Sequence, residues 1–448
     1  MKTKARGGLK LNYRNTFMIG FGFLASSLVW SIYNAFVPLL LEQRFLLSTA
    51  TIGTIMTIDN FFGVIFQPLV GALSDRTITK RGRRMPWIIV GLPICAILFA
   101  FIPRMRALGA MMAVIVIFNL VMSLWRSPVI ALMPDVTPKS LRSLANGVIN
   151  LMGGIGAIVA FGVGGALAKV NDTLPFLMGS ILMLFALAML VIFVREPIAL
   201  KIKQSRGLKF TPREMRLWRE AQEHKLLENT IIENKEDKVS GKDRYAAFKA
   251  LSGTQKRSLM FLLLAIFFWF CAYNAIETFF TLYATNVLGV SDGSASQMLT
   301  AFSLSFVAFA LPAGMLAEKI GRKRTILIGL TGLVVVFIPA LRVTDTTLLL
   351  ILLLVGGVFW SCVNINSLPM VVELATSESI GAFTGYYYFF SFSAAIVSPI
   401  LFGWIRDVTE DYSTLFIYSV IAFAIALVMM IFVKHGDHKL ADDAPKEA

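Results

Sequence analysis

The sequence predicts an all-α integral membrane protein with twelve transmembrane helices in two pseudo-symmetric six-helix bundles. Its composition is the first reason: 56% of the 448 residues are hydrophobic and 15% are charged, whereas about a quarter of the residues of a soluble globular chain are charged. The second reason is that apolar runs of roughly 18 to 25 residues recur along the chain, each long enough to cross a hydrocarbon core about 30 Å thick. The third is that several motifs of the first half return in the second.

The predicted spans follow one another closely except at one point. They lie near residues 17–41, 50–72, 86–103, 109–133, 145–168, 175–194, 258–285, 295–317, 325–341, 347–372, 381–405 and 413–433. Between residues 195 and 257 the chain carries mixed charge and few apolar side chains, which predicts a linker with one or two surface helices. We therefore expect an N-terminal bundle in 1–194, the linker in 195–257, a C-terminal bundle in 258–433 and a tail in 434–448.

The distribution of basic residues predicts the orientation of the chain. Lysine and arginine are concentrated in the N-terminal segment and in the loops near residues 76–84, 139–142 and 319–324, while the intervening loops hold few. This positive-inside pattern places both termini and the linker in the cytoplasm of a protein of the cell membrane. It also accounts for the formal net charge of +15 without any binding to nucleic acid.

Four short motifs of the first half of the chain recur in the second half at a nearly constant offset. The tripeptide YNA occurs at Tyr33 and again at Tyr273, 240 residues later. The other three are Trp30 with Trp269, GALSDRTITKRGRR from Gly71 with GMLAEKIGRKR from Gly314, and ANG at 145–147 with FTG at 383–385. Four echoes in register indicate two parallel six-helix repeats with a substrate site between them near the bilayer midplane.

The stretch GALSDRTITKRGRR resembles the loop signature of the major facilitator superfamily, G-x-L-(S/A)-D-R followed by a G-R-R/K cluster, and the resemblance extends over essentially the whole chain. Within the superfamily, residues 67–88 and 127–158 resemble the sucrose/proton symporters of plants, their animal solute-carrier relatives and their bacterial cousins. The neighbouring glycoside-pentoside-hexuronide:cation symporters are the alternative. Either branch implies the major facilitator fold and transport by alternating access.

The resemblance also implies a cytoplasmic gate. In the superfamily the motif aspartate, here Asp75, lies near a helix N-terminus and pairs with arginine across the cytoplasmic face, so a dipole interaction adds to charge-assisted hydrogen bonds. The alternative is that Arg83 and Arg84 only set the topology. The gate residues are Gly71, Asp75, Arg76, Gly82, Arg83 and Arg84, with Gly314, Gly321 and Arg322 in the second copy.

Three charged residues inside the predicted spans, Asp59, Arg126 and Glu277, are candidates for proton coupling, since a charge in a span costs a few kcal/mol. Arg126 can neutralise one carboxylate while the other binds and releases a proton; Asp59 is the preferred proton site. Sodium coordination of the melibiose-carrier type is disfavoured, because its aspartates would fall near Gly63 and Gln67. The plant sucrose carriers have an aspartate near the position of Asn119, so their coupling residue cannot be transferred directly.

Sugar hydroxyls need short polar side chains that donate and accept, and the apolar faces of a pyranose ring stack on aromatic rings. The YNA tripeptides supply both, and Glu277 lies one turn from Asn274 on the same helix face. Interhelical hydrogen bonds for the amides, and core or interface packing for the aromatic residues, are the alternatives. The predicted substrate-binding residues are Tyr33, Asn34, Asn60, Gln67, Asn119, Trp125, Asn150, Trp269, Tyr273, Asn274, Thr278, Asn364, Asn366 and Tyr387.

The sequence shows no phosphate-cradling loop, zinc-ligand spacing or catalytic triad, and its three cysteines fall in predicted spans, where they are expected as small core residues. We therefore predict no enzyme activity, cofactor or metal. The predicted function is a monomeric proton-coupled symporter of a sugar, a disaccharide or glucoside such as sucrose or maltose. The alternatives are a sodium-coupled melibiose-type symporter, a proton-coupled exporter of amphipathic compounds, and a sensor without transport that signals through the linker.

Overall fold

The computed structural model describes residues 11–138, 141–223, 249, 251–375 and 379–435. The first ten residues, residues 224–248 and 250 of the predicted linker, and most of the predicted tail lie outside the described residues. Within the described part, twelve segments are long and apolar enough to cross a membrane, as predicted. A helix is required there because hydrocarbon offers no partner for backbone N–H and C=O groups.

The N-terminal half of the chain contains the helices α1 (Tyr13–Phe45), α2 (Thr49–Met56), α3 (Ile58–Arg76), α4 (Met85–Phe101), α5 (Leu108–Val136), α6 (Arg142–Ala168) and α7 (Leu174–Phe193). Two shorter helices follow in the segment predicted as a linker, α8 (Pro197–Ser205) and α9 (Pro212–Glu223). The C-terminal half contains α12 (Gly253–Leu288), α13 (Asp292–Ile320), α14 (Arg322–Ala340), α15 (Thr346–Val372), α16 (Ile380–Thr409) and α17 (Thr414–Ile431).

The second predicted span consists of two helices, α2 and α3, which meet at Thr57. The Thr57 hydroxyl donates to the Thr54 carbonyl at 2.8 Å, and the Thr54 hydroxyl donates to the Ala50 carbonyl at 2.8 Å. Threonine hydroxyls compete in this way for carbonyls that would otherwise extend the helical ladder. The break places Asp59 in the first turn of α3 rather than in the middle of a continuous helix.

The described chain divides into two compact units, and several helices contribute to both. Unit 1 comprises residues 1–31, 62–160 and 173–238; in it α4 packs between α5 and α7. Its core includes Phe99, whose ring lies 5.4 Å from that of Phe118 and 5.0 Å from that of Phe176.

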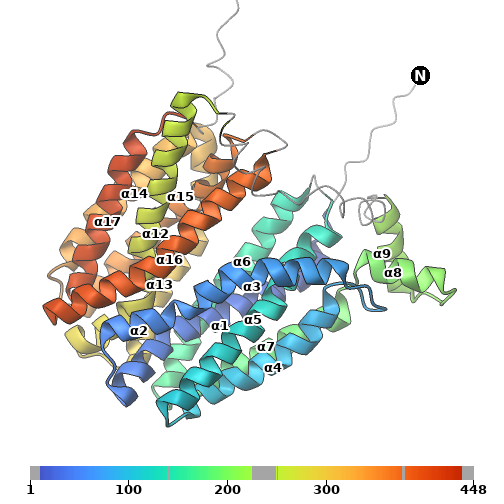
Figure 1. The fold of residues 1–448 in the computed structure, drawn as a ribbon, viewed down its shortest axis with the longest axis horizontal. Coiled ribbons are helices and arrows are strands. Elements are labelled where there is room, and N and C mark those ends of the chain that lie inside the picture. The colour runs from blue at the N-terminus through green and yellow to red at the C-terminus, as the bar shows by residue number, and fades with distance from the viewer. Residues whose placement is uncertain (1–10, 139–140, 224–248, 250, 376–378, 436–448) are drawn as a thin grey trace, which may run out of the picture. The chain divides into compact units, whose positions relative to one another are not determined.

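Unit 2 comprises residues 32–61, 161–172 and 239–448. Here α12 packs against α16 and α17, α14 packs against α15 and α17, and α13 packs against α15 (Figure 1). The fully buried rings of Phe337 and Phe416 meet at 5.6 Å between α14 and α17. As expected, all three cysteines are buried and unbridged.

Candidate transport site and gates

A small cavity of about 30 Å³ lies inside unit 2 beside the middle of α12. A space of this size holds only a water molecule or two. Most of its wall is apolar, and Glu277 is the carboxylate that it contains. The lining residues are Phe161, Tyr273, Ile276, Glu277, Leu299, Phe302, Ser303, Leu333, Phe337, Trp360 and Phe423.

Glu277 is hydrogen-bonded to side chains from both YNA tripeptides, Asn34 of α1 and Tyr273 of its own helix. The Tyr273 ring stacks on that of Trp360 with centroids 4.6 Å apart and planes 3° apart. This stack fixes the tyrosine that holds the carboxyl group. Glu277, which occurs only in the second YNA segment, is therefore hydrogen-bonded to the asparagine of the first segment.

Other predicted site residues of unit 2 are used within the bundle. The Asn366 amide donates to the Cys362 carbonyl at 2.9 Å and to that of Ala313 on α13 at 3.5 Å. The Tyr387 hydroxyl lies 3.1 Å from that of Ser367, which links α16 to α15. The Asn366 contact with Ala313 is an interhelical hydrogen bond, which was the alternative for the amides. The Tyr387 hydroxyl makes a contact of the same kind.

The remaining predicted residues of unit 2 vary in their surroundings. The Asn274 amide donates to the Phe270 carbonyl of its own helix at 2.6 Å, and the Asn60 amide donates to the Asp59 carboxylate at 2.8 Å. Tyr33 and Trp269 are fully buried and Thr278 is buried, while Asn364 is partly buried.

The predicted residues of unit 1 are described within that unit. The Arg126 guanidinium lies 5.7 Å from the centre of the Trp30 ring. Trp125 is fully buried, and Asn150 is exposed on α6. The Gln67 carbonyl accepts from Ser127 at 2.9 Å, which joins α3 to α5.

Asn119 of α5 is 1% exposed, and neither polar atom of its amide has a hydrogen-bond partner among the described residues. A buried polar group left in this way costs about 1 to 3 kcal/mol. Asn119 is therefore a strong substrate-site candidate within unit 1, because a hydroxyl or water reaching it would recover that energy.

At one end of unit 2, segments of the two sequence halves meet in a layer of polar and close backbone contacts that the sequence did not reveal. The Asp407 carboxylate of α16 accepts from the backbone N–H groups of Thr49 and Ala50, at 2.8 and 2.9 Å, and so caps the N-terminus of α2. Glu42 of α1 accepts from the Tyr412 hydroxyl at 2.6 Å and from the Asn286 amide at 3.0 Å. We call this layer the outer gate, because the charge pattern of the sequence predicts that this end faces away from the cytoplasm and the function proposed below requires it to open.

Glycines bring the backbones together in the outer gate. A Cβ on Gly403 would lie 2.5 Å from the Thr49 carbonyl oxygen, and a Cβ on Gly53 would lie 2.2 Å from that of Pro399. A Cβ on Gly165 of α6 would lie 2.6 Å from the Gly293 carbonyl oxygen. These contacts allow α2 to lie directly on α16, and α6 on α13, with no side chain between.

At the motif loop of unit 1, Arg84 binds both Asp75 and Asp135, the latter at 2.8 Å. Its guanidinium also donates to the Ser74 hydroxyl. Burial alone would lower the pKa of Arg84, but Asp135 and Asp75 more than offset this and raise it above its ordinary value. Arg84 is thus a fixed cation between the ends of α3 and α5.

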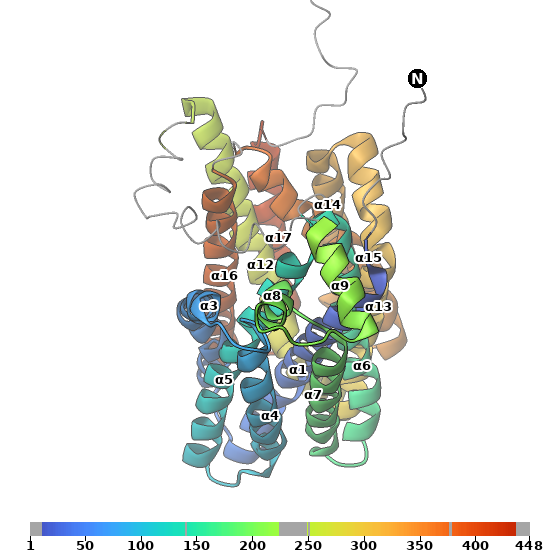
Figure 2. The same cartoon turned by 90° about the vertical axis from the view of Figure 1, so that its right-hand side faces the viewer.

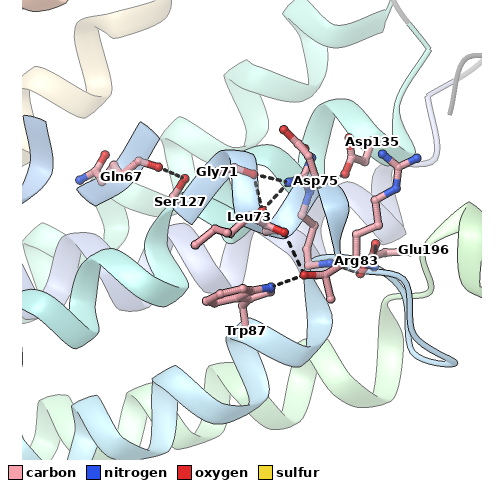
Figure 3. Close-up of polar contacts among 12 residues, drawn as sticks. Gln67, Gly71, Leu73, Asp75, Arg83, Trp87, Ser127, Asp135 and Glu196 are labelled. Atoms are coloured by element: carbon pink, nitrogen blue, oxygen red, sulfur yellow. Dashed lines mark hydrogen bonds and ion pairs between the residues drawn. The ribbon is translucent and has the colours of Figure 1, made fainter. Parts of the chain in front are cut away.

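Glu196, which the sequence reasoning missed, ties the same loop to the segment after α7. Its carboxylate accepts from the backbone N–H groups of Arg83 at 2.7 Å and of Arg84 and Met85 at 2.9 Å each. Figure 3 shows Glu196 beside Arg83. Burial raises the pKa of Glu196, and the three N–H donors oppose that shift. Gly82, with φ of +116°, leaves room for the carboxylate, because a Cβ there would lie 2.3 Å from it.

The second copy of the motif is simpler. Gly321, with φ of +93°, ends α13, and Arg322 at the start of α14 forms an ion pair with Glu373 at the end of α15. Lys323 donates to the carbonyls of Ile431 and Val433 at the end of α17. Each half therefore contains an arginine bound to an acid at the end of its fourth span.

Comparison with protein families connects this architecture to known transporters. The family model of the Major Facilitator Superfamily matches residues 19–298 and 262–448. The chain belongs to the Major Facilitator Superfamily. It is accordingly a multi-pass integral membrane protein of a transporter family whose members are generally not enzymes.

Among individual proteins of the superfamily, the chain is similar to the uncharacterized MFS-type transporter YxiO of Bacillus subtilis (strain 168), with 25% identity over 399 residues that cover 86% of this chain and 85% of that one. A shorter match, 29% over 83 residues or 18% of this chain and 15% of the other, is to the uncharacterized symporter sll1374 of Synechocystis.

Solved structures of the superfamily share the fold. A variant of the nucleoside transporter NupG matches with a TM-score of 0.70 at 17% identity, over 94% of this chain and 100% of that one. The xylose transporter XylE of E. coli matches with a TM-score of 0.66 at 16% identity, over 94% and 98%. At these identities the likeness shows the fold alone.

Proposed function

We propose that this protein is a proton-coupled symporter that takes up a sugar, a disaccharide or glucoside such as sucrose or maltose, across the cell membrane. It works as a monomer with both termini in the cytoplasm. The observation that carries the proposal is the setting of Glu277, a carboxyl group held by Asn34 and Tyr273 at the edge of a small, largely apolar cavity. An ionised carboxylate is costly in such surroundings, so a proton that binds there can be coupled to a change of conformation.

The outer gate supports transport by alternating access. Its contacts join α2 to α16 and α6 to α13, so helices of both repeats meet at one end of unit 2. Rocking of the repeats would have to break these contacts to open that end. Several of them are hydrogen bonds, whose donors and acceptors can exchange these partners for water when the end opens.

Two carboxylates compete for the role of proton site. Asp59 hydrogen-bonds to its neighbour Asn60 in the first turn of α3, whereas Glu277 joins α1 to α12 and borders the cavity. A proton on Glu277 changes a contact between the two repeats. We therefore assign the coupling proton to Glu277, and Asp59 remains the second candidate.

The test is uptake of labelled sucrose and maltose into proteoliposomes under an imposed pH gradient, an imposed sodium gradient, or neither. Glu277→Gln and Asp59→Asn are compared with Glu318→Gln, which removes an exposed carboxylate of α13. We expect uptake to follow the pH gradient, and Glu277→Gln to keep sugar exchange while losing accumulation. The control should accumulate sugar as the parent does.

The other outcomes lead to the alternatives. Accumulation driven by sodium would favour a melibiose-type symporter. Absence of any sugar exchange would discard the substrate class and favour an exporter of amphipathic compounds, which the aromatic lining around Glu277 would also suit. Loss of accumulation in Asp59→Asn alone would move the proton site to Asp59.

A further inference from the structure

Three arginines gather where α7 ends in unit 1. Arg14 is in the first turn of α1, Arg195 follows α7 directly, and Arg213 is in the first turn of α9. The guanidinium carbon of Arg213 lies 4.9 Å from the centre of the Phe193 ring, and that of Arg14 lies 5.8 Å from the same centre. Figure 2 shows α9 beyond the end of α7. We call these three residues the arginine cluster.

The positive charge of the cluster is not balanced by acids of the described chain. Among the described residues none of the three arginines forms an ion pair, and the nearby acids are engaged elsewhere. Glu196 binds the N–H groups of the motif loop, Glu214 binds Lys203 at 2.7 Å, and Glu220 accepts from Asn12 at 2.8 Å.

The cluster residues instead satisfy part of their donors on helix carbonyls. Arg213 donates to the carbonyls of Ile192 and Phe193, and Arg195 donates to those of Val191 and Val194. Carbonyls carry only partial charge, so the arginines still repel one another. Burial lowers the pKa of Arg213, and the charges of Arg14 and Arg195 lower it further.

The surface around the cluster is apolar on the side of the membrane span. Phe17 is 42% exposed one turn along α1 from Arg14, and Ile192 is 54% exposed in the last turn of α7. Met215 is exposed on α9 beside Arg213. In a bilayer, exposed apolar side chains at the end of a span would face acyl chains, which would place the arginines at headgroup depth.

From this arrangement we propose that the arginine cluster is a binding site for the phosphate of an anionic phospholipid in the leaflet that the charge pattern assigns to the cytoplasm. The phosphate supplies the missing negative charge, and guanidinium groups bind phosphate oxygens in a bidentate geometry. The acyl chains cover Phe17 and Ile192. A free phosphate or an acidic peptide would leave these apolar side chains uncovered, which is why a lipid is the favoured occupant.

The experiment measures lipid binding by native mass spectrometry of the purified full chain in detergent, with phosphatidylglycerol and with phosphatidylethanolamine of the same acyl chains. Each basic side chain near an anionic surface contributes about fivefold to binding. We therefore expect the variant Arg14→Gln/Arg195→Gln/Arg213→Gln to lose about 100-fold in affinity for phosphatidylglycerol. Binding of phosphatidylethanolamine should change little.

The matched control is Lys80→Gln/Lys319→Gln/Arg324→Gln, which removes the same charge from exposed side chains elsewhere. An equal loss in this control, or equal binding of both lipids by the parent, would overturn the proposal. Displacement of phosphatidylglycerol by millimolar inorganic phosphate alone would also overturn it, because the occupant would then be a free anion.

A second triple variant guards against misfolding. Arg14→Lys/Arg195→Lys/Arg213→Lys keeps the charge but not the bidentate geometry, so it should bind phosphatidylglycerol more weakly than the parent and more tightly than the glutamine variant. Binding as weak as that of the glutamine variant, at an unchanged unfolding temperature, would overturn the role given to the positive charge of the cluster. None of these readouts depends on transport, so the outcome is independent of the proposed substrate and coupling ion.

Discussion

The contact of α2 with α16 makes a quantitative test of the outer gate possible. In Gly403→Ala the new Cβ would lie 2.5 Å from the Thr49 carbonyl oxygen, whereas Cβ atoms essentially never come within 3.0 Å of another heavy atom, so the two backbones must separate by about 0.5 Å. Overpacking of this kind costs about 1 to 3 kcal/mol. The cost falls on the state in which the gate is closed, so the population of the open state should rise about 5- to 150-fold.

The assay is labelling of Thr49→Cys by a membrane-impermeant maleimide, in a background whose three buried cysteines are replaced by alanine. Thr49 is 1% exposed with the gate closed, so labelling reports opening. The control is Gly147→Ala, where no heavy atom lies within 4 Å of the new Cβ, and it corrects for the higher helix propensity of alanine. An equal rate in Gly403→Ala and in the control would refute the idea that this backbone contact holds the gate closed.

Three further results are expected. Asp407→Ala removes the cap on α2 and should cost about 1 to 2 kcal/mol, so labelling of Thr49→Cys should rise about 5- to 30-fold; an unchanged rate would mean that the cap does not hold the gate. Arg84→Gln leaves two partly exposed carboxylates without their cation, so the free energy of unfolding should fall by up to about 3 kcal/mol in thermal unfolding. The control variant Arg81→Gln, at an exposed position, should unfold as the parent does. Although burial opposes the shift, Lys203 and Thr211 lower the pKa of Glu214 to about 2. The ionised Glu214 therefore holds α9 fully above its ordinary pKa of 4.5, and this contribution is lost as the pH falls towards 2. The fluorescence of Trp218, which packs on Phe210, should shift to the red only in that pH interval. In Glu214→Gln the same shift should be present already at pH 7.

The spans could be predicted because apolar length and backbone hydrogen bonding leave a membrane segment almost no alternative to a helix. The break between α2 and α3 could not be predicted, since the run around Thr57 is long enough to be one continuous span and contains neither glycine nor proline at the break. It depends on which carbonyls the hydroxyls of Thr54 and Thr57 reach. That choice is made by rotamers and packing, which a hydropathy pattern does not record.

The candidate site was predictable by residue type and not by contact. Glu277 stood out as a charge in a span, and its partner Asn34 stood out through the repeat of YNA. Asn366 and Tyr387 had the same polar character but bond within the C-terminal half, because helix rotation decides which neighbour a polar side chain meets. Glu196 escaped notice because it begins a segment of mixed charge, where a single carboxylate does not stand out as it does inside a span.

The two motif loops are held by opposite kinds of hydrogen bond, one to an acid outside the loop and one from a base, and this difference gives a way to separate their roles. Both turn at a glycine with positive φ, Gly82 and Gly321. In the first half an acid from beyond the sixth span, Glu196, accepts from N–H groups of the loop; in the second half a base of the loop, Lys323, donates to carbonyls at the end of the twelfth span. Glu196→Gln weakens three charge-assisted hydrogen bonds at once, and Lys323→Gln removes a cation whose carbonyl partners can turn to water. Hydrogen exchange should therefore rise in the 77–85 loop of the first variant by more than in the 320–323 loop of the second, and equal increases would contradict this unequal tethering.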